Sequence, residues 1–521
     1  MPFRWVIVED MNRTRGMPMP YLHALAESST LTRRQVIQGM IGLAASSLLP
    51  GCGSSPSGVP PQQNPQPVPE GPLTQASLIV TATTTGSIGP AFAGLSYEKS
   101  KLYEPIFTAS NSDLIGIFDR LGSSVLRVGG NSVDRNVWTP GGPGQTPGQI
   151  ASSDVDSLAA FVKAAGWQCL YGINLGGAAT GATTPALAAA EVAYAAQQLG
   201  SSLLGIEIGN EPDLYGDAGN YFAGNWSLSQ FLTLWDEFRA AIVGSTPGVP
   251  ITGPADASHE STWTVPFGET VTKSEITLLT QHYYRANGQS PGSTAAYLIT
   301  PDPTLIANLA ILEAGTQGIG VSYRMSECNS FYNGGASGVS DSYASSLWVI
   351  DYLFNCAQGG AVGVNFHGGG DGSGYTPIAD NDGSVVGARP EFYGILLFTL
   401  AGQGTLYTSQ ISAGSLNVTA YAVKTSSGLN LIVVNKDLTQ NLQLTVQLPR
   451  GASSATLLTM TQLTSGAMGP DLSATSGVTI QGASVNPNGT FSPAAPYTLN
   501  PSGSELTCYV PALSAVLIQT A

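Results

Sequence analysis

The segment Gly205-Ile206-Glu207-Ile208-Gly209-Asn210-Glu211-Pro212 runs an apolar strand directly into a glutamate. The segment Val321-Ser322-Tyr323-Arg324-Met325-Ser326-Glu327 does the same further along the chain. Pro212 has no backbone N–H for a strand ladder, so it ends the first strand and leaves Glu211 projecting beyond it. If both strands belong to one parallel sheet or barrel, they end at the same edge. The pattern then predicts that Glu211 and Glu327 face each other.

The sequence around these two segments alternates short apolar strands with amphipathic helices. We expect eight strand-helix units, one with a weak helix, and their strands lie at 91–96, 125–129, 167–174, 203–209, 249–254, 276–283, 321–326 and 361–367. Eight such units predict a closed (β/α)8 barrel of the TIM type, with an open doubly wound sheet as the alternative. Catalytic groups of such barrels lie after the strands, where Glu211 follows the fourth strand and Glu327 the seventh.

The pattern changes after residue 404, where short alternating strands follow one another without helices. Residues 405–521 are therefore predicted to form an antiparallel β-sandwich. The segment 76–90 has the same alternation and is expected to add an N-terminal strand to that domain. The predicted fold class is α/β, with the catalytic barrel at 91–404.

The first residues resemble an export signal. Thr32-Arg33-Arg34-Gln35-Val36-Ile37-Gln38 precedes an apolar stretch that ends in Leu49-Pro50-Gly51-Cys52. Twin arginines and a lipoprotein-like box indicate that 1–52 is a leader with a lipid anchor at Cys52, although the proline departs from the usual box. A short buried helix is the alternative, and the stretch is too short to span a bilayer. The Pro- and Ser-rich segment 53–75 is predicted to be a linker. We expect a periplasmic or cell-surface protein of a bacterium.

Composition excludes several classes of ligand. The net charge is -15 with 19 Lys and Arg, so a nucleic-acid partner is not expected. An anionic ligand would instead have to be held by local groups such as backbone N–H donors. No spacing typical of a metal site and no dinucleotide motif is present, so neither metal nor cofactor is expected. Sequence alone cannot pair four of the cysteines, Cys169, Cys328, Cys356 and Cys508.

Two facing carboxyl groups are what glycoside hydrolysis requires, since one must protonate the leaving oxygen and one must stabilise the anomeric carbon. Glu211 is the candidate general acid, which needs a raised pKa, and Glu327 is the candidate nucleophile, which must stay ionised. Asn210 is placed to contact the sugar 2-hydroxyl, while Glu207 is interpreted as a structural acid inside the barrel. Ordinary strand-to-loop turns are the alternative interpretation of both segments.

Two further groups are expected beside the nucleophile. His282-Tyr283-Tyr284 ends the sixth strand and offers a phenol that could donate to Glu327. Arg127 ends the second strand and could keep the same carboxylate ionised. A packed aromatic side chain and a buried structural ion pair are the respective alternatives.

With these residues in view, the chain resembles glycoside hydrolase family 79, the β-glucuronidase and heparanase family of retaining barrel glycosidases. The resemblance is strongest at Gly205–Pro212, Gln281–Tyr284, Tyr323–Gly335 and Val364–Tyr375. It implies Glu211 as acid/base, Glu327 as nucleophile and Tyr283 as a contact of the nucleophile. It also implies that the uronate carboxylate is recognised by Tyr332, Gly334, Gly335, Gly374 and Tyr375. Glu98 and Asn131 are implied as contacts of sugar hydroxyls.

The expected substrate is a glucuronide-containing carbohydrate. Family members that cut heparan sulfate carry basic clusters, whereas this chain has few Lys or Arg, so exo-acting release of a terminal β-linked uronate is favoured. A neutral-sugar specificity, such as that of an arabinofuranosidase or glucosidase, is the alternative on the same barrel. A surface lipoprotein that binds sugar without hydrolysing it is the alternative from another class. Activity is expected to be greatest below neutral pH.

Overall fold

The computed structural model describes residues 64–521, except 225, 272 and 464–468. The predicted leader and lipid site, and the linker up to residue 63, lie outside the described residues. The first long strand, β1, spans Leu73–Ile88 and so begins inside the segment predicted as linker. Its first half alternates exposed and buried side chains, with Ala76, Leu78 and Val80 turned inward, which is the pattern of a half-buried strand.

Eight parallel strands close into a barrel, which confirms the predicted fold and excludes the open sheet. Around the barrel these strands are β2 (Ala93–Glu98), β3 (Val125–Gly129), β6 (Gln168–Ile173), β7 (Leu203–Ile208), β8 (Ile251–Asp256), β9 (Leu278–Asn287), β10 (Tyr323–Tyr332) and β11 (Val364–Gly368). Most of their side chains are buried on both faces, as expected for strands covered by helices.

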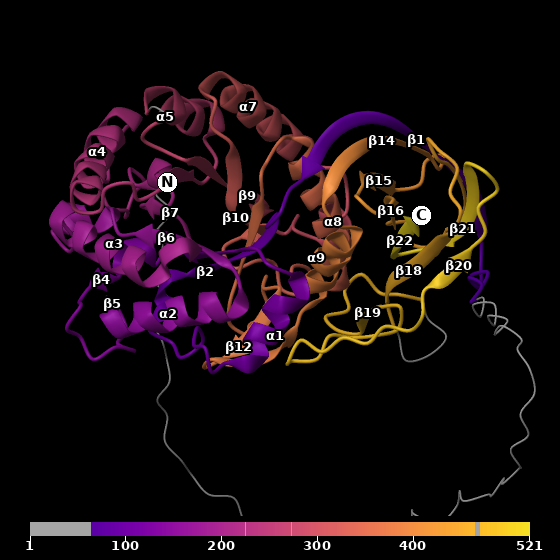
Figure 1. The fold of residues 1–521 in the computed structure, drawn as a ribbon, viewed down its shortest axis with the longest axis horizontal. Coiled ribbons are helices and arrows are strands. Elements are labelled where there is room, and N and C mark those ends of the chain that lie inside the picture. Colours follow the sequence, from indigo (N-terminus) through magenta and orange to yellow (C-terminus); the bar gives the residue numbers. More distant parts are fainter. Residues whose placement is uncertain (1–63, 225, 272, 464–468) are drawn as a thin grey trace, which may run out of the picture. The chain divides into compact units, whose positions relative to one another are not determined.

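Helices surround the barrel (Figure 1). They are α1 (Ser112–Leu121), α2 (Ser152–Ala165), α3 (Pro185–Leu199), α4 (Leu228–Ser245), α5 (Val265–Thr270), α6 (Ala295–Leu298), α7 (Pro303–Ile319), α8 (Tyr343–Gln358) and α9 (Pro390–Ala401). Asn111, Thr184, Ser227 and Asp302 cap four of them by accepting a backbone N–H. The predicted weak helix after the fifth strand is the short α5, which a π-turn at Glu260–Thr264 precedes.

A second, curled sheet of ten strands packs beside the barrel. It contains β1, β14 (Gly404–Ser412), β15 (Val418–Lys424), β16 (Leu429–Asn435), β17 (Asn441–Gln447), β18 (Ala455–Gln462), β19 (Val478–Ile480), β20 (Tyr497–Leu499), β21 (Glu505–Val510) and β22 (Ser514–Thr520). β1, drawn in indigo, lies beside β14 in Figure 1, and its other neighbour in the sheet is β17. It pairs antiparallel with β14 and parallel with β17, so the N-terminal strand completes the C-terminal domain.

Helix α8 of the barrel packs against the curled sheet. Asp351 on this helix accepts hydrogen bonds from Thr419 and Tyr421 and pairs with Lys436. The rings of Phe354 and Tyr421 stack with centroids 4.2 Å apart. These contacts fix the helix that follows β10 against the second domain.

Two short pairs of strands complete the described fold, β4 (Val137–Trp138) with β5 (Gln149–Ile150), and β12 (Ile378–Asn381) with β13 (Ser384–Ala388). The stretch Ala295–Ile319 is long and apolar enough to cross a membrane, a property shared by core helices of soluble proteins. In the structure it forms α6 and α7, and Leu305, Leu309 and Leu312 of α7 are buried. The four cysteines left unpaired above are free and buried.

Candidate active site

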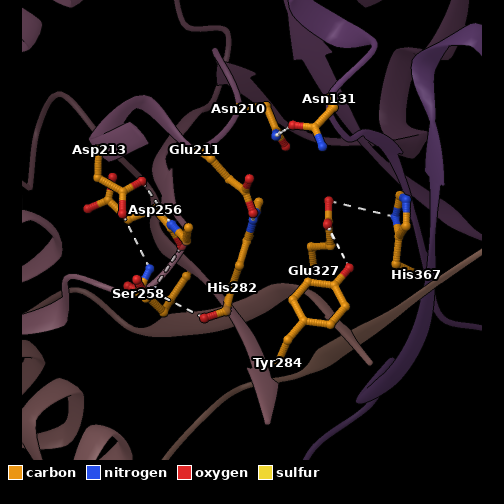
Figure 2. A network of polar contacts seen from close by, with 12 residues as sticks. Asn131, Asn210, Glu211, Asp213, Asp256, Ser258, His282, Tyr284, Glu327 and His367 are labelled. Carbon is orange, nitrogen blue, oxygen red and sulfur yellow. Dashed lines mark hydrogen bonds and ion pairs between the residues drawn. The ribbon is translucent and has the colours of Figure 1, made fainter. Parts of the chain in front are cut away.

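The two predicted glutamates meet at the carboxyl ends of the barrel strands (Figure 2). Glu211 follows β7 with a left-handed backbone, φ 49° and ψ 52°, and its N–H donates to the carbonyl of Ala255 at 2.9 Å. Glu327 lies within β10, which continues further than predicted. The register of β10 shifts between Met325 and Glu327, and this irregularity sets which residues turn toward the barrel mouth.

Glu211 and Glu327 are close enough for a retaining mechanism. One carboxyl oxygen of each and a ring nitrogen of His282 all lie within 4.8 Å of one another. Inverting enzymes keep their carboxyl groups about 6.5 to 9.5 Å apart to admit water, whereas retaining enzymes keep them about 5 to 5.5 Å apart. The same three side chains have ligand types that suit a metal ion. However, both oxygens of Glu327 already accept hydrogen bonds, from Arg127 and Tyr284.

Arg127 pairs with the nucleophile candidate, where it was expected to act, and also joins it to the barrel interior. Its Nη1 donates to Glu327 Oε2 and its Nε to Glu207 Oε2, both at 2.6 Å. Its Nη2 donates to Asn210 Oδ1 at 2.8 Å. One buried guanidinium therefore orients both the nucleophile candidate and the residue before the acid candidate. Glu207 is confirmed as an interior acid, because its side chain is fully buried in this pair.

The prediction that Tyr283 contacts the nucleophile is wrong. Tyr284 makes this contact, and its hydroxyl donates to Glu327 Oε1 at 2.8 Å. Tyr283 instead donates to Asp302 at 2.7 Å. The reason is the two-residue period of a strand, which puts His282 and Tyr284 on the face of β9 that meets the glutamates and Tyr283 on the other.

Two histidines near the carboxyl groups were not predicted. His282 Nδ1 lies 3.2 Å from Glu211 Oε1. His367, on β11, places Nδ1 3.6 Å from Glu327 Oε2 and Nε2 3.7 Å from Glu98 Oε1. A usable signal existed in the sequence, because both histidines are in apolar strands whose carboxyl ends reach the same edge as the glutamates.

The surroundings move the pKa values of Glu211 and Glu327 in opposite directions. Burial, together with the charges of Glu327 and Asp213, raises the pKa of Glu211 above its ordinary value, although His282 opposes this. Burial also acts to raise the pKa of Glu327, but His367, His282, Arg127 and the Tyr284 hydroxyl outweigh it and hold that pKa far below its ordinary range. The pKa of Glu211 is therefore moved up and that of Glu327 down, which is the direction that a general acid and a nucleophile require.

The predicted contacts of sugar hydroxyls line the same edge. Asn210 Nδ2 points to Asn131 Oδ1 at 3.4 Å, and the backbone N–H of Asn210 donates to the Tyr215 hydroxyl at 3.2 Å. Glu98 accepts the N–H of Ser132 at 2.7 Å. Asn210, Asn131 and Glu98 are therefore brought together around the two glutamates. The sequence signal for Tyr215 was weak, since it lies beyond the strand.

The two loops predicted to recognise a uronate cross each other. The Tyr375 N–H donates to the Gly334 carbonyl at 3.3 Å, and a Cβ on Gly374 would lie 2.0 Å from that oxygen. Glycine is thus required at 374 by close backbone approach. The Gly374 N–H is used by the carbonyl of Gly372, so among the predicted backbone donors it is not available to a ligand.

Other groups among the residues predicted to recognise a uronate remain available to a ligand. Within the described ranges, the N–H groups of Gly334 and Gly335 donate to no protein acceptor. Tyr332 is 44% exposed. The Tyr375 ring faces the site, with its centroid 5.7 Å from that of Tyr284 and 6.0 Å from that of His367.

Comparison with known proteins finds glycosidases among those similar to this chain. No family model matches the chain. It is 26% identical over 330 residues to a β-glucuronidase of Aspergillus niger, a match that covers 55% of this chain and 58% of that protein. It is 24% identical over 312 residues to a β-glucuronidase of Neurospora crassa, covering 52% and 54%. In sequence, the chain is similar to β-glucuronidases. The matches span a little over half the length of these relatives.

Solved structures support the fold over more of the chain. A 4-O-α-L-rhamnosyl-β-D-glucuronidase from Fusarium oxysporum matches with a TM-score of 0.67 at 17% identity, covering 85% of this chain and all of that one. A family 51 α-L-arabinofuranosidase from Bifidobacterium longum matches with a TM-score of 0.62 at 15% identity, covering 86% and 100%. At these identities the likeness confirms the barrel and its second domain, and no more.

Proposed function

We propose that the protein is a retaining, exo-acting β-glucuronidase. The observation that carries the proposal is the pair Glu211 and Glu327, close together and with their acidities moved in opposite directions. The sequence similarity to two β-glucuronidases supports the same class of reaction.

The reaction then proceeds by double displacement. The Glu327 carboxylate attacks the anomeric carbon, and Glu211 gives its proton to the glycosidic oxygen as the bond to the leaving group breaks. In the second step Glu211, now ionised, takes a proton from water. The water oxygen bonds to the anomeric carbon and releases Glu327. Arg127 and Tyr284 hold Glu327 in its ionised form between turnovers.

The preference for a uronate rests on the crossed loops. Among the described residues the N–H groups of Gly334 and Gly335 donate to no protein acceptor, so they offer a carboxylate two neutral donors, and the Tyr375 ring lies beside that of Tyr284. Neutral donors suit a protein of net charge -15, which has few cations to spare for an acidic sugar. The scarcity of basic residues also favours a terminal uronate over the interior of a sulfated polymer.

Hydrolysis of 4-nitrophenyl β-glucuronide tests the assignment. Glu327→Gln and Glu211→Gln should each lower kcat/KM by about a thousandfold or more, because each removes one required group. Glu313→Gln is the matched control, since Glu313 lies beside a cavity at the opposite end of the barrel, and it should leave kcat/KM unchanged. Full turnover in either active-site variant would remove the assignment.

A neutral-sugar specificity is the second candidate, favoured by the fold that this chain shares with arabinofuranosidases. Rates on matched aryl β-glucuronide, β-glucoside and α-arabinofuranoside separate the candidates. We expect the glucuronide to be hydrolysed at least about a hundredfold faster, which corresponds to about 2.7 kcal/mol of discrimination. Faster hydrolysis of a neutral substrate would favour the second candidate.

An exported location, with a lipid anchor at Cys52, is proposed from the leader sequence alone. Export through the twin-arginine route should fail when Arg33 and Arg34 are both replaced by lysine. Cell fractionation measures this, and unchanged export would contradict it.

A further inference from the structure

Asp213 ties the loop that carries Glu211 to the end of β8. Its buried carboxylate accepts the N–H of Ala257 at 2.9 Å and that of Ser258 at 3.3 Å. His259 Nδ1 lies 2.7 Å from the same group (some of these contacts are visible in Figure 2). Three donors converge on one carboxylate, an arrangement that suits its ionised form.

This connection is made where the backbone is strained. Glu211 and Ala255 both have positive φ values, 49° and 64°, which are unfavourable for residues other than glycine. The N–H of Glu211 donates to the carbonyl of Ala255, so the two strained residues are joined directly. Asp213 binds the backbone just beyond Ala255 and thereby holds both in place.

Asp256, the last residue of β8, is in the opposite situation. The Thr264 hydroxyl contacts both Asp256 Oδ2, at 2.9 Å, and Gln281 Oε1. The Gln281 amide is oriented by its Nε2, which donates to the carbonyls of Asp256 and His282 at 2.9 and 3.1 Å. Its Oε1 can therefore only accept. Thr264 has one hydroxyl proton, which goes to Gln281, so its contact with Asp256 requires a proton on Asp256.

Two more observations agree with this count of protons. Asp256 is fully buried, and its Oδ1 has no hydrogen-bond partner in the described part of the chain. An ionised carboxylate would be costly there without donors. Burial first, and then the negative charge of Asp213, raises the pKa of Asp256 well above its ordinary value.

We propose that Asp213 is an anionic positioning residue for Glu211, and that Asp256 is a permanently protonated acid that fastens β8 to β9. The proposal rests on the proposed function, because it takes Glu211 as the acid/base. In this arrangement the charge of Asp213 disfavours ionisation of Glu211 and extends its acid form to higher pH. Asp256, being neutral, adds nothing to this field.

Other titratable groups face Glu211 or the two aspartates from the surrounding elements. They are His282 on β9, Glu327 on β10, Tyr375 after β11, Asp217 after β7, and His259 and Glu260 after β8. These groups are the same in any pair of variants at the two aspartates. The difference between such variants therefore isolates the contribution of Asp213 from that of Asp256.

The matched pair Asp213→Asn and Asp256→Asn tests the proposal through the pH dependence of kcat/KM. Asp213→Asn removes the charge and turns an amide toward backbone donors. We expect a loss of about 10- to 100-fold and an alkaline limb shifted to lower pH by about half a unit to one unit. Asp256→Asn keeps a donor to Thr264, so we expect kcat/KM within about threefold of wild type and an unmoved limb. Equal losses in both variants, or an unmoved limb in Asp213→Asn, would overturn the proposal.

Infrared difference spectroscopy reads the proton on Asp256 without using catalysis. At neutral pH, the wild type minus Asp256→Asn spectrum should contain the carbonyl band of a protonated carboxylic acid. The wild type minus Asp213→Asn spectrum should contain a carboxylate band instead. The absence of the acid band in the first spectrum would overturn the proposal. This readout does not depend on hydrolysis, so failure here is distinguishable from failure of the proposed function.

Discussion

Two buried arginines lie at opposite ends of the barrel, and their charges are balanced in different ways. Arg127, near the carboxyl ends of the strands, pairs with Glu207 and Glu327. Arg324, at the start of β10, is 3% exposed and donates to Asn365 Oδ1 at 2.5 Å and to three main-chain carbonyls. Among the described residues, it has no carboxylate within ion-pair distance.

The pKa values of the two arginines differ in the direction that these surroundings predict. Burial acts to lower the pKa of Arg127, but its two carboxylates raise it above the ordinary value. Burial lowers the pKa of Arg324 to about 9, with little opposing it. At the first end, one guanidinium is shared by two carboxylates, one of which is the nucleophile candidate Glu327. At the second end the arginine fills space, since a Cβ on Gly363 would lie 2.0 Å from its Nη1.

A large cavity lies at the end of the barrel that lacks the paired carboxyl groups. A cavity of about 870 Å³ lies at the Arg324 end and is lined in part by the segment that follows β1. The paired carboxyl groups and the perturbed acidities are at the other end. Charge arrangement, rather than volume, therefore identifies the candidate active site.

Arg127→Met should have the largest effect on activity. It leaves the buried Glu207 and Glu327 without the guanidinium that pairs with both, which raises the pKa of Glu327 and removes the hydrogen bond to Asn210. We expect kcat/KM on an aryl β-glucuronide to fall about a thousandfold, and urea unfolding to show a loss of about 3 to 5 kcal/mol. Retained activity in this variant would show that the ion pairs have no role in catalysis.

Tyr284→Phe and Tyr283→Phe form a matched pair on adjacent residues of β9. Loss of the Tyr284 hydroxyl removes one donor from Glu327, and we expect kcat/KM to fall about 10- to 100-fold. Tyr283→Phe should change it less than about threefold, because that hydroxyl binds Asp302. Steady-state kinetics of both variants decide this, and the reverse order would contradict the contact assigned to Tyr284.

Glu391 extends the comparison to a buried acid, which has no cation within ion-pair distance in the described part of the chain. It is fully buried on α9 and accepts a hydrogen bond from Asn329 at 3.2 Å. Burial raises the pKa of Glu391 to about 8. The folded state then keeps a proton that the unfolded state releases above its ordinary pKa of 4.5, so stability is lost as the pH rises from about 4.5 to 8.

Glu391→Gln should remove this dependence. Between those pH limits, the unfolding free energy of the wild type should fall relative to the variant by about 3 to 5 kcal/mol. Urea unfolding at several pH values measures the difference. Parallel curves for the two proteins would show that Glu391 is ionised in the folded state.

Arg324→Met should have the smallest effect. Asn365 and the main-chain carbonyls lose a donor, so we expect a loss of about 1 to 3 kcal/mol in unfolding free energy. The value of kcat/KM should stay within about threefold of wild type, because Arg324 lies at the other end of the barrel. A tenfold loss of activity in well-folded protein would break the contrast with Arg127.

The sequence predicted the features that depend on strand pattern. Both glutamates, Arg127 and the barrel followed from apolar strands that end on polar residues. Tyr283 was predicted as the contact of Glu327 in place of its neighbour Tyr284. Which of two adjacent side chains of β9 faces Glu327 depends on how β9 is paired with β10. His367 and Asp213 were missed, since their contacts depend on how loops and neighbouring strands meet, which no local pattern encodes.

The most direct test of the central claim is the anomer first released from an aryl β-glucuronide, followed by proton NMR in the first minutes of hydrolysis. If Glu327 attacks the anomeric carbon from below and Glu211 activates water in the second step, two inversions give net retention. The account predicts that β-glucuronic acid appears first and then mutarotates. Initial release of α-glucuronic acid would contradict it.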